Sequence, residues 1–120
     1  MTKEEKIRLE KISLETAQRL IDYNSYGKNK SKAISAMKRR ISGFEKEVYA
    51  DYLDRAISVH TDAIEFVKKH CEAFHQTYKE NGDGSGVEQI ATDFLSKHDE
   101  YQRSHLCGTL GFIFYIWHLR

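Results

Sequence analysis

Four residues carry metal-ligating side chains at helical spacing. Cys71 and His75 are four residues apart, and His98 and His105 are seven apart, so each pair shares one face of a predicted helix. A thiolate and imidazoles are ligands that zinc prefers. Glu72 lies three residues before His75, as in carboxylate-bridged metal bundles, but such bundles need this unit twice. We expect core packing here and predict no metal or cofactor, although whether the four side chains meet stays open.

The loop 81–86 has the oxygen-bearing side chains of the first half of an EF-hand calcium loop. Asn81, Asp83 and Ser85 occupy its positions 1, 3 and 5, with glycine at position 6. Position 12 requires a bidentate glutamate and is Thr92 here. The sequence therefore favours a polar loop between two helices over a calcium site.

Arg55 and His60 are separated by four residues. This spacing is similar to that of HEPN-type ribonucleases, which are also small helical proteins, and the resemblance implies ribonuclease activity. His60 also falls on the apolar stripe of its predicted helix, where a core histidine is the usual interpretation. A metal-dependent or HEPN-like ribonuclease is therefore kept as a further alternative, and no family is assigned.

The strongest functional pattern is an uneven distribution of charge. The chain has a formal net charge of +1, yet residues 23–43 contain no acidic residue. Like charges this close together repel one another unless an anionic partner relieves them. The predicted macromolecule-binding residues are the six basic residues of this segment: Lys28, Lys30, Lys32, Lys38, Arg39 and Arg40.

An acidic protein surface or a nucleic-acid backbone would both complement this basic segment. Tyr23 and Tyr26 lie just before the first of the six basic residues and could stack on bases. Six positive charges are few for a nucleic-acid-binding protein, and no nucleic-acid-binding motif accompanies them. A protein partner with an acidic surface is therefore preferred, and nucleic-acid binding through residues 28–40 is the alternative.

The elements that must carry these residues are all predicted to be helices. The chain of 120 residues has no proline and is 40% hydrophobic, which favours long helices around a core. Apolar residues recur every three or four positions, and the predicted helices cover residues 3–23, 31–42, 44–79, 87–97 and 99–119. We expect the helix over 44–79 to bend or break near Ser58–Thr61, because 36 residues are long for so small a protein.

These elements predict an all-α, single-domain bundle of four to five helices over residues 1–120. Its long central segment lies within 44–79. Its C-terminal helix is almost entirely apolar after Leu106, although the run 112–117 has a strand-like composition. A helix without a polar face must be enclosed by neighbours or by a second copy, so we expect a homodimer.

The two cysteines, Cys71 and Cys107, do not make a disulfide framework, and the charged N-terminus does not resemble a secretory signal. We therefore expect a cytoplasmic protein. The uncharged run 104–119 is somewhat short for a membrane span, so no membrane anchor is predicted. The functional prediction is a non-enzymatic protein that binds another macromolecule, for example as an adaptor, subunit or inhibitor.

Overall fold

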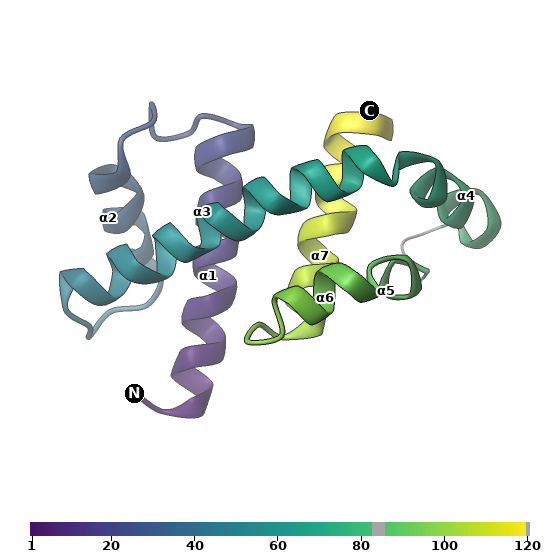
Figure 1. Ribbon diagram of the computed structural model, residues 1–120. Coiled ribbons are helices and arrows are strands. Elements are labelled where there is room, and N and C mark those ends of the chain that lie inside the picture. Colours follow the sequence, from purple (N-terminus) through teal and green to yellow (C-terminus); the bar gives the residue numbers. More distant parts are fainter. Residues whose placement is uncertain (83–85, 120) are drawn as a thin grey trace. The chain divides into compact units, whose positions relative to one another are not determined.

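A computed structural model describes residues 1–82 and 86–119 (Figure 1). Within these ranges the chain forms seven α-helices and one π-helix, and no strand. The all-α prediction is confirmed, and the strand-like run 112–117 is helical. The helix count exceeds the predicted four to five because three predicted segments each divide in two.

The chain consists of two compact units, residues 1–60 and 61–120. Helix α3 (Lys46–Lys69) contains the boundary between them. The single domain over residues 1–120 stays a prediction.

The first unit begins with α1 (Lys3–Asp22), whose start is set by a capping box. The Thr2 hydroxyl accepts a hydrogen bond from the Glu5 amide at 3.1 Å, and the Glu5 carboxylate accepts one from the Thr2 amide at 2.9 Å. These bonds satisfy two of the amides that a helix start leaves without partners. The buried side chains of α1 include Leu9, Leu14 and Ala17, as its apolar spacing predicts.

Helix α2 (Lys30–Arg40) packs beside α1 and is capped by Asn29. The Asn29 side chain accepts a hydrogen bond from the Lys32 amide at 3.2 Å. The inward side chains of α2 and of the residue after it are buried: Ala33, Ile34, Met37 and Ile41. The buried Tyr49 of α3 donates its hydroxyl to the Ile41 carbonyl at 2.6 Å, which connects the end of α2 to α3.

A buried hydrogen bond joins α1 to α3 within the first unit. His60 Nε2 lies 3.0 Å from Asp22 Oδ2, and both side chains are 0% exposed. The other polar atom of each group, Asp22 Oδ1 and His60 Nδ1, has no hydrogen-bond partner among the described residues. Burying a polar group without a hydrogen-bond partner is costly. This one hydrogen bond must therefore offset the desolvation of both side chains.

The second unit contains the rest of α3 followed by five short elements. These are α4 (Cys71–Asn81), α5 (Val87–Ile90), α6 (Thr92–Lys97), α7 (Arg103–Phe114) and the π-helix η1 (Tyr115–Leu119). The expected break near Ser58–Thr61 is wrong, because α3 runs through these residues without interruption. The break lies at His70 instead, where α3 ends and α4 begins.

Phenylalanine side chains form the centre of the second unit. Phe66 of α3 contacts Phe74 of α4 and Phe94 of α6, with ring centroids 6.3 Å and 5.4 Å apart. Phe74 in turn stacks on Phe114 of α7, with centroids 5.4 Å apart. These contacts join α3 to α4, α6 and α7, three helices that would be too short to be stable alone.

The predicted apolar C-terminal helix is only partly enclosed. Leu106, Leu110 and Ile113 of α7 are buried, as expected for a core helix. Tyr115 and Trp117 of η1 are instead 53% and 54% exposed. In the described ranges, no helix combines the length and the apolar character needed to cross a bilayer.

The buried Asp22–His60 contact predicts a strong energetic coupling. Replacing either residue by leucine leaves the other polar group buried without a partner, so each single variant should lower the free energy of unfolding by about 3 kcal/mol. The double variant should lose less than the sum of the two, by about 1–3 kcal/mol. Urea unfolding of the four proteins measures this coupling.

The matched control for this cycle is the exposed pair Arg55–Asp51, whose atoms lie 2.8 Å apart on α3. Its coupling should stay below about 1 kcal/mol, because solvent screens exposed ion pairs. Equal coupling in the two cycles would contradict the assigned role of the buried contact.

Candidate anion-binding site

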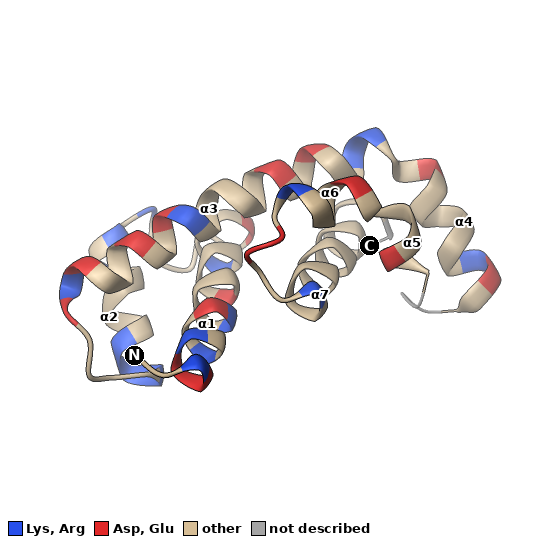
Figure 2. Cartoon of the chain, turned by 60° about the horizontal axis from the view of Figure 1, so that its bottom comes forward, with Lys and Arg blue, Asp and Glu red and all other residues tan. Residues whose placement is uncertain are grey.

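All six basic residues predicted to bind a macromolecule are exposed. Figure 2 shows lysine and arginine along α2 and no acidic residue on that helix. Three of the six side chains already have partners within the first unit. Lys30 Nζ lies 2.7 Å from Asp54 Oδ1, and Lys38 Nζ lies 5.8 Å from the centre of the Tyr49 ring. The third, Arg40, pairs with Glu15 at 3.0 Å.

Part of the basic segment lines a cavity of about 440 Å³ in the first unit, which we call the basic cavity. Arg39 and Arg40 of α2 lie on one side, and Arg19 near the end of α1 joins them. Further polar lining comes from Thr16, Tyr23, Ser25 and Tyr26. The four lysines of the predicted site, Lys28, Lys30, Lys32 and Lys38, do not line it. The predicted site therefore divides into two cavity-lining arginines and four lysines outside the cavity.

The turn after α1 brings the two tyrosines to this cavity. The Ser25 amide donates to the Arg19 carbonyl at 3.0 Å, which folds the chain back over the last turn of α1. Asn24 has a φ of 51°, a left-handed conformation that asparagine tolerates better than most residues. The turn therefore places Tyr23 and Tyr26 beside Arg19, because the chain does not continue along the axis of α1.

The electrostatic character of the basic cavity is strongly positive. No aspartate or glutamate is among the described residues that line it. Glu15 pairs with Arg40, but Arg19 and Arg39 form no ion pair within the described ranges. Two guanidinium groups beside tyrosine and serine hydroxyls provide the donors that recognise a carboxylate or a phosphate.

Sequence reasoning missed Arg19, because it belongs to a stretch of α1 whose charges balance. The signal that could have found it is its spacing from Tyr23. Residues four apart lie on the same helix face, so the spacing makes Arg19 and Tyr23 neighbours at the end of α1.

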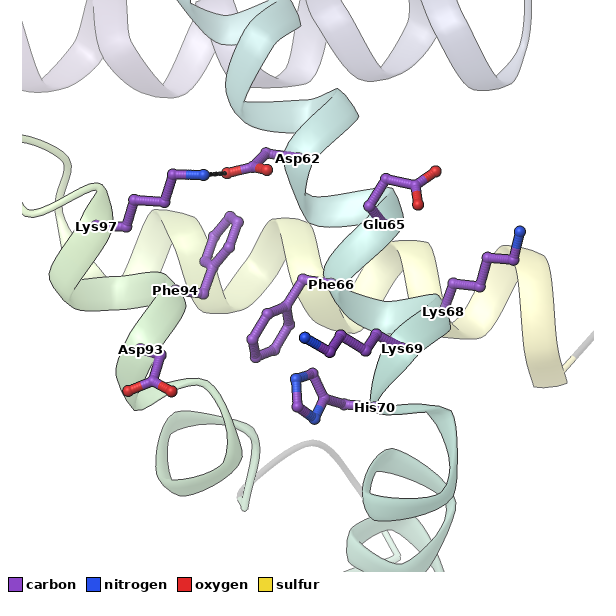
Figure 3. Close-up of a pocket in the computed structure, with 9 residues that line it drawn as sticks. All are labelled: Asp62, Glu65, Phe66, Lys68, Lys69, His70, Asp93, Phe94 and Lys97. Carbon is purple, nitrogen blue, oxygen red and sulfur yellow. Dashed lines mark ion pairs between the residues drawn. The ribbon is translucent and has the colours of Figure 1, made fainter.

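A second cavity, of about 680 Å³, lies in the second unit and has mixed charge (Figure 3). Phe66 and Phe94 line it in contact with each other, while Lys69 and His70 lie beside Phe66. At one edge, Asp62 accepts hydrogen bonds from Lys97 at 2.9 Å and from His98 at 2.7 Å. These bonds, that of Lys97 first, hold the pKa of Asp62 below its ordinary value.

The candidate metal ligands do not converge. His98 bonds Asp62, and the His75 ring packs edge-on against Phe114 with centroids 4.8 Å apart. Cys71 lies beside His118 and not beside a second candidate ligand. Over residues 1–82 and 86–119, no three His, Cys, Asp or Glu residues are grouped in a way that could hold a metal ion.

The other two sequence motifs have different outcomes. Residues five apart on an α-helix are rotated by about 140°, so Arg55 and His60 diverge. Arg55 pairs with Asp51 at the surface, and His60 is fully buried against Asp22. In the candidate calcium loop, Asp83 and Ser85 lie outside the described residues.

No protein-family model, no curated protein and no solved structure matches this chain.

The lowered pKa of Asp62 predicts a pH-dependent stability. A carboxylate whose folded pKa is lowered contributes stability that is present above its unfolded pKa, about 3.9, and is lost as the pH falls through the folded value. Wild type should therefore exceed Asp62→Asn in unfolding free energy at pH 5, and this difference should shrink steadily toward pH 2. Urea unfolding at a series of pH values measures it.

The control is Asp93→Asn, which alters a carboxylate of the same cavity that has no ion pair among the described residues. Its difference from wild type should be nearly independent of pH. A difference for Asp62→Asn that stays constant from pH 5 to pH 2 would contradict the role given to Lys97 and His98.

Proposed function

We propose that this chain is a non-enzymatic cytoplasmic protein that binds an acidic segment of another protein at the basic cavity, as an adaptor, subunit or inhibitor would. The observation that carries the proposal is the pair Arg19 and Arg39. Both line the cavity, neither forms an ion pair within the described ranges, and no described carboxylate lines the cavity with them.

The size of the cavity favours a protein partner. About 440 Å³ accommodates one or two carboxylate side chains, and two arginine forks can each bind a carboxylate through paired hydrogen bonds. Lys28 and Lys32 lie outside the cavity and are exposed. They extend the positive surface and would attract an acidic segment before it docks.

Nucleic-acid binding is the second candidate, and the two tyrosines favour it. Tyr23 is 50% exposed and Tyr26 is partly exposed, and both line the same cavity as Arg19 and Arg39. Aromatic rings beside arginines are the side chains on which unpaired bases stack. A single-stranded nucleic acid would therefore place a phosphate in the cavity and a base on Tyr23.

Reversing the two unpaired arginines should abolish most of the binding. Arg19→Glu/Arg39→Glu should weaken binding of poly-L-glutamate, used as the acidic polypeptide probe, by about tenfold or more, because attraction becomes repulsion. Both side chains are exposed, so the unfolding free energy should change by only about 0.5 kcal/mol for each. Fluorescence anisotropy of a labelled probe measures the affinity.

The matched control is Arg8→Glu/Lys11→Glu, which makes the same change in net charge at exposed positions of α1 outside the cavity. It should weaken binding by less than about threefold. Equal losses in the two variants would mean that only total charge matters and would refute the assignment of the cavity.

A 20-nucleotide single-stranded RNA tests the second candidate with the same variants. If RNA binds more tightly than poly-L-glutamate, and the slope of log affinity against log salt becomes shallower by about 1.4 in Arg19→Glu/Arg39→Glu, the partner is a nucleic acid. RNA that does not bind at 150 mM salt supports the protein partner.

The exposed aromatic residues of η1 make the predicted homodimer testable. Tyr115 and Trp117 present two large apolar side chains to solvent. If a second copy covers them, Tyr115→Ser/Trp117→Ser should weaken self-association by about tenfold or more. Sedimentation velocity measures it, and a 14.0 kDa monomer for wild type at all micromolar concentrations would remove the homodimer.

A further inference from the structure

Cys71 occupies the first position of α4, directly after the break at His70. His70 ends α3 and precedes α4, because its amide donates to the Phe66 carbonyl and its carbonyl accepts from the Phe74 amide. The first amides of α4 therefore form a helix start, an end that carries a partial positive charge and favours an anion.

A histidine lies within hydrogen-bonding distance of the same thiol. Cys71 Sγ is 3.4 Å from His118 Nδ1, although the two residues are 47 positions apart in the chain. The His118 ring stacks on Phe114, with centroids 5.9 Å apart and an interplanar angle of 21°. Phe114 is fully buried and itself stacks on Phe74 of α4, so the ring of His118 rests on a fixed surface.

Cys71 also opens onto a cavity. This cavity, of about 510 Å³, is lined by Lys68, Lys69, His70 and Glu72 in addition to Cys71. The two lysines outweigh the one carboxylate, and neither lysine forms an ion pair within the described ranges. The approach to the thiol is therefore electropositive and favours an anionic reagent.

We propose that Cys71 and His118 form a nucleophile–base pair and that Cys71 is a modification site for small anionic disulfides of the glutathione type. Cys71 and His118 belong to residues 61–120 and the basic cavity to residues 1–60, so this inference does not rest on the proposed function. The pair combines two features that activate a cysteine, an adjacent base and a helix start, while the neighbouring lysines attract an anionic reagent.

The reaction is a thiol–disulfide exchange. The Cys71 proton moves from Sγ to Nδ1 of His118, and the thiolate attacks one sulfur of the disulfide. A new S–S bond forms to Cys71 as the disulfide's own S–S bond breaks. The departing sulfur takes the bonding electron pair and then the proton from His118. Cys71 is thereby oxidised to a mixed disulfide, and half of the reagent is reduced to a thiol.

The second cysteine of the chain provides an internal reference. Cys107 lies within α7, away from a helix start, and is partly buried like Cys71. Burial raises the pKa of the Cys107 thiol, and the Glu88 carboxylate raises it further against the opposing effect of Arg103. Cys107 should therefore remain a protonated, slowly reacting thiol in the same molecule.

The wild-type protein alone gives the first test. With oxidised glutathione at pH 7.5, peptide mass spectrometry measures the modification rate of each cysteine in the folded chain and in 6 M urea. Cys71 should react at least about tenfold faster folded than unfolded, whereas Cys107 should react more slowly folded than unfolded. A folded Cys71 that is no faster than unfolded Cys71 would overturn the proposal.

Two variants separate the contributions of the base and the cations. His118→Asn should slow the modification of Cys71 by about tenfold or more and leave Cys107 unchanged. Lys68→Gln/Lys69→Gln should slow the reaction with oxidised glutathione but not with the neutral bis(2-hydroxyethyl) disulfide. An unaltered Cys71 rate in His118→Asn rejects the base, and equal slowing with both reagents rejects an electrostatic role for the lysines.

Discussion

The position of the basic cavity depends on where α1 ends, and the buried bond between Asp22 and His60 holds that end. Asp22 is the last residue of α1, and its carboxylate is fixed on α3 by a histidine that has no access to solvent. The turn that follows begins at Tyr23 and returns over Arg19. A buried polar pair thus orients residues that line the basic cavity. Such pairs are weak evidence for stability, because desolvating them is costly, but they can define one arrangement among several.

The first unit follows closely from its sequence because its signals are local. Apolar residues three or four positions apart predict helices over 3–23 and 31–42, and α1 and α2 occupy these segments. The partner of His60 could not be predicted in this way, since Asp22 is 38 residues distant and lies on a different helix. The same holds for Arg19, which reaches the basic cavity only through the turn after α1.

In the second unit, local spacing suggested Cys71 and His75 as a pair but did not reveal the residues that they contact. Their spacing makes both candidate metal ligands, because the two share a helix face. The contact that Cys71 forms is with His118, 47 residues away, and His75 packs against Phe114 instead. The break at His70 was also missed. No proline or glycine marks it, and the aromatic contacts of Phe66, Phe74 and Phe94 are tertiary interactions that no local pattern reveals.

The π-helical turn that carries His118 limits which insertions and deletions the chain tolerates. A π-turn holds about one residue more than an α-turn, and π-turns are understood as single-residue insertions into α-helices. Deleting one residue between Phe114 and His118 would restore α-helical winding and rotate the histidine by about 100°. The imidazole would then leave the sulfur of Cys71 and the face of Phe114 together. Homologous chains that retain this pair should therefore conserve the number of residues in 115–117, whatever their identities.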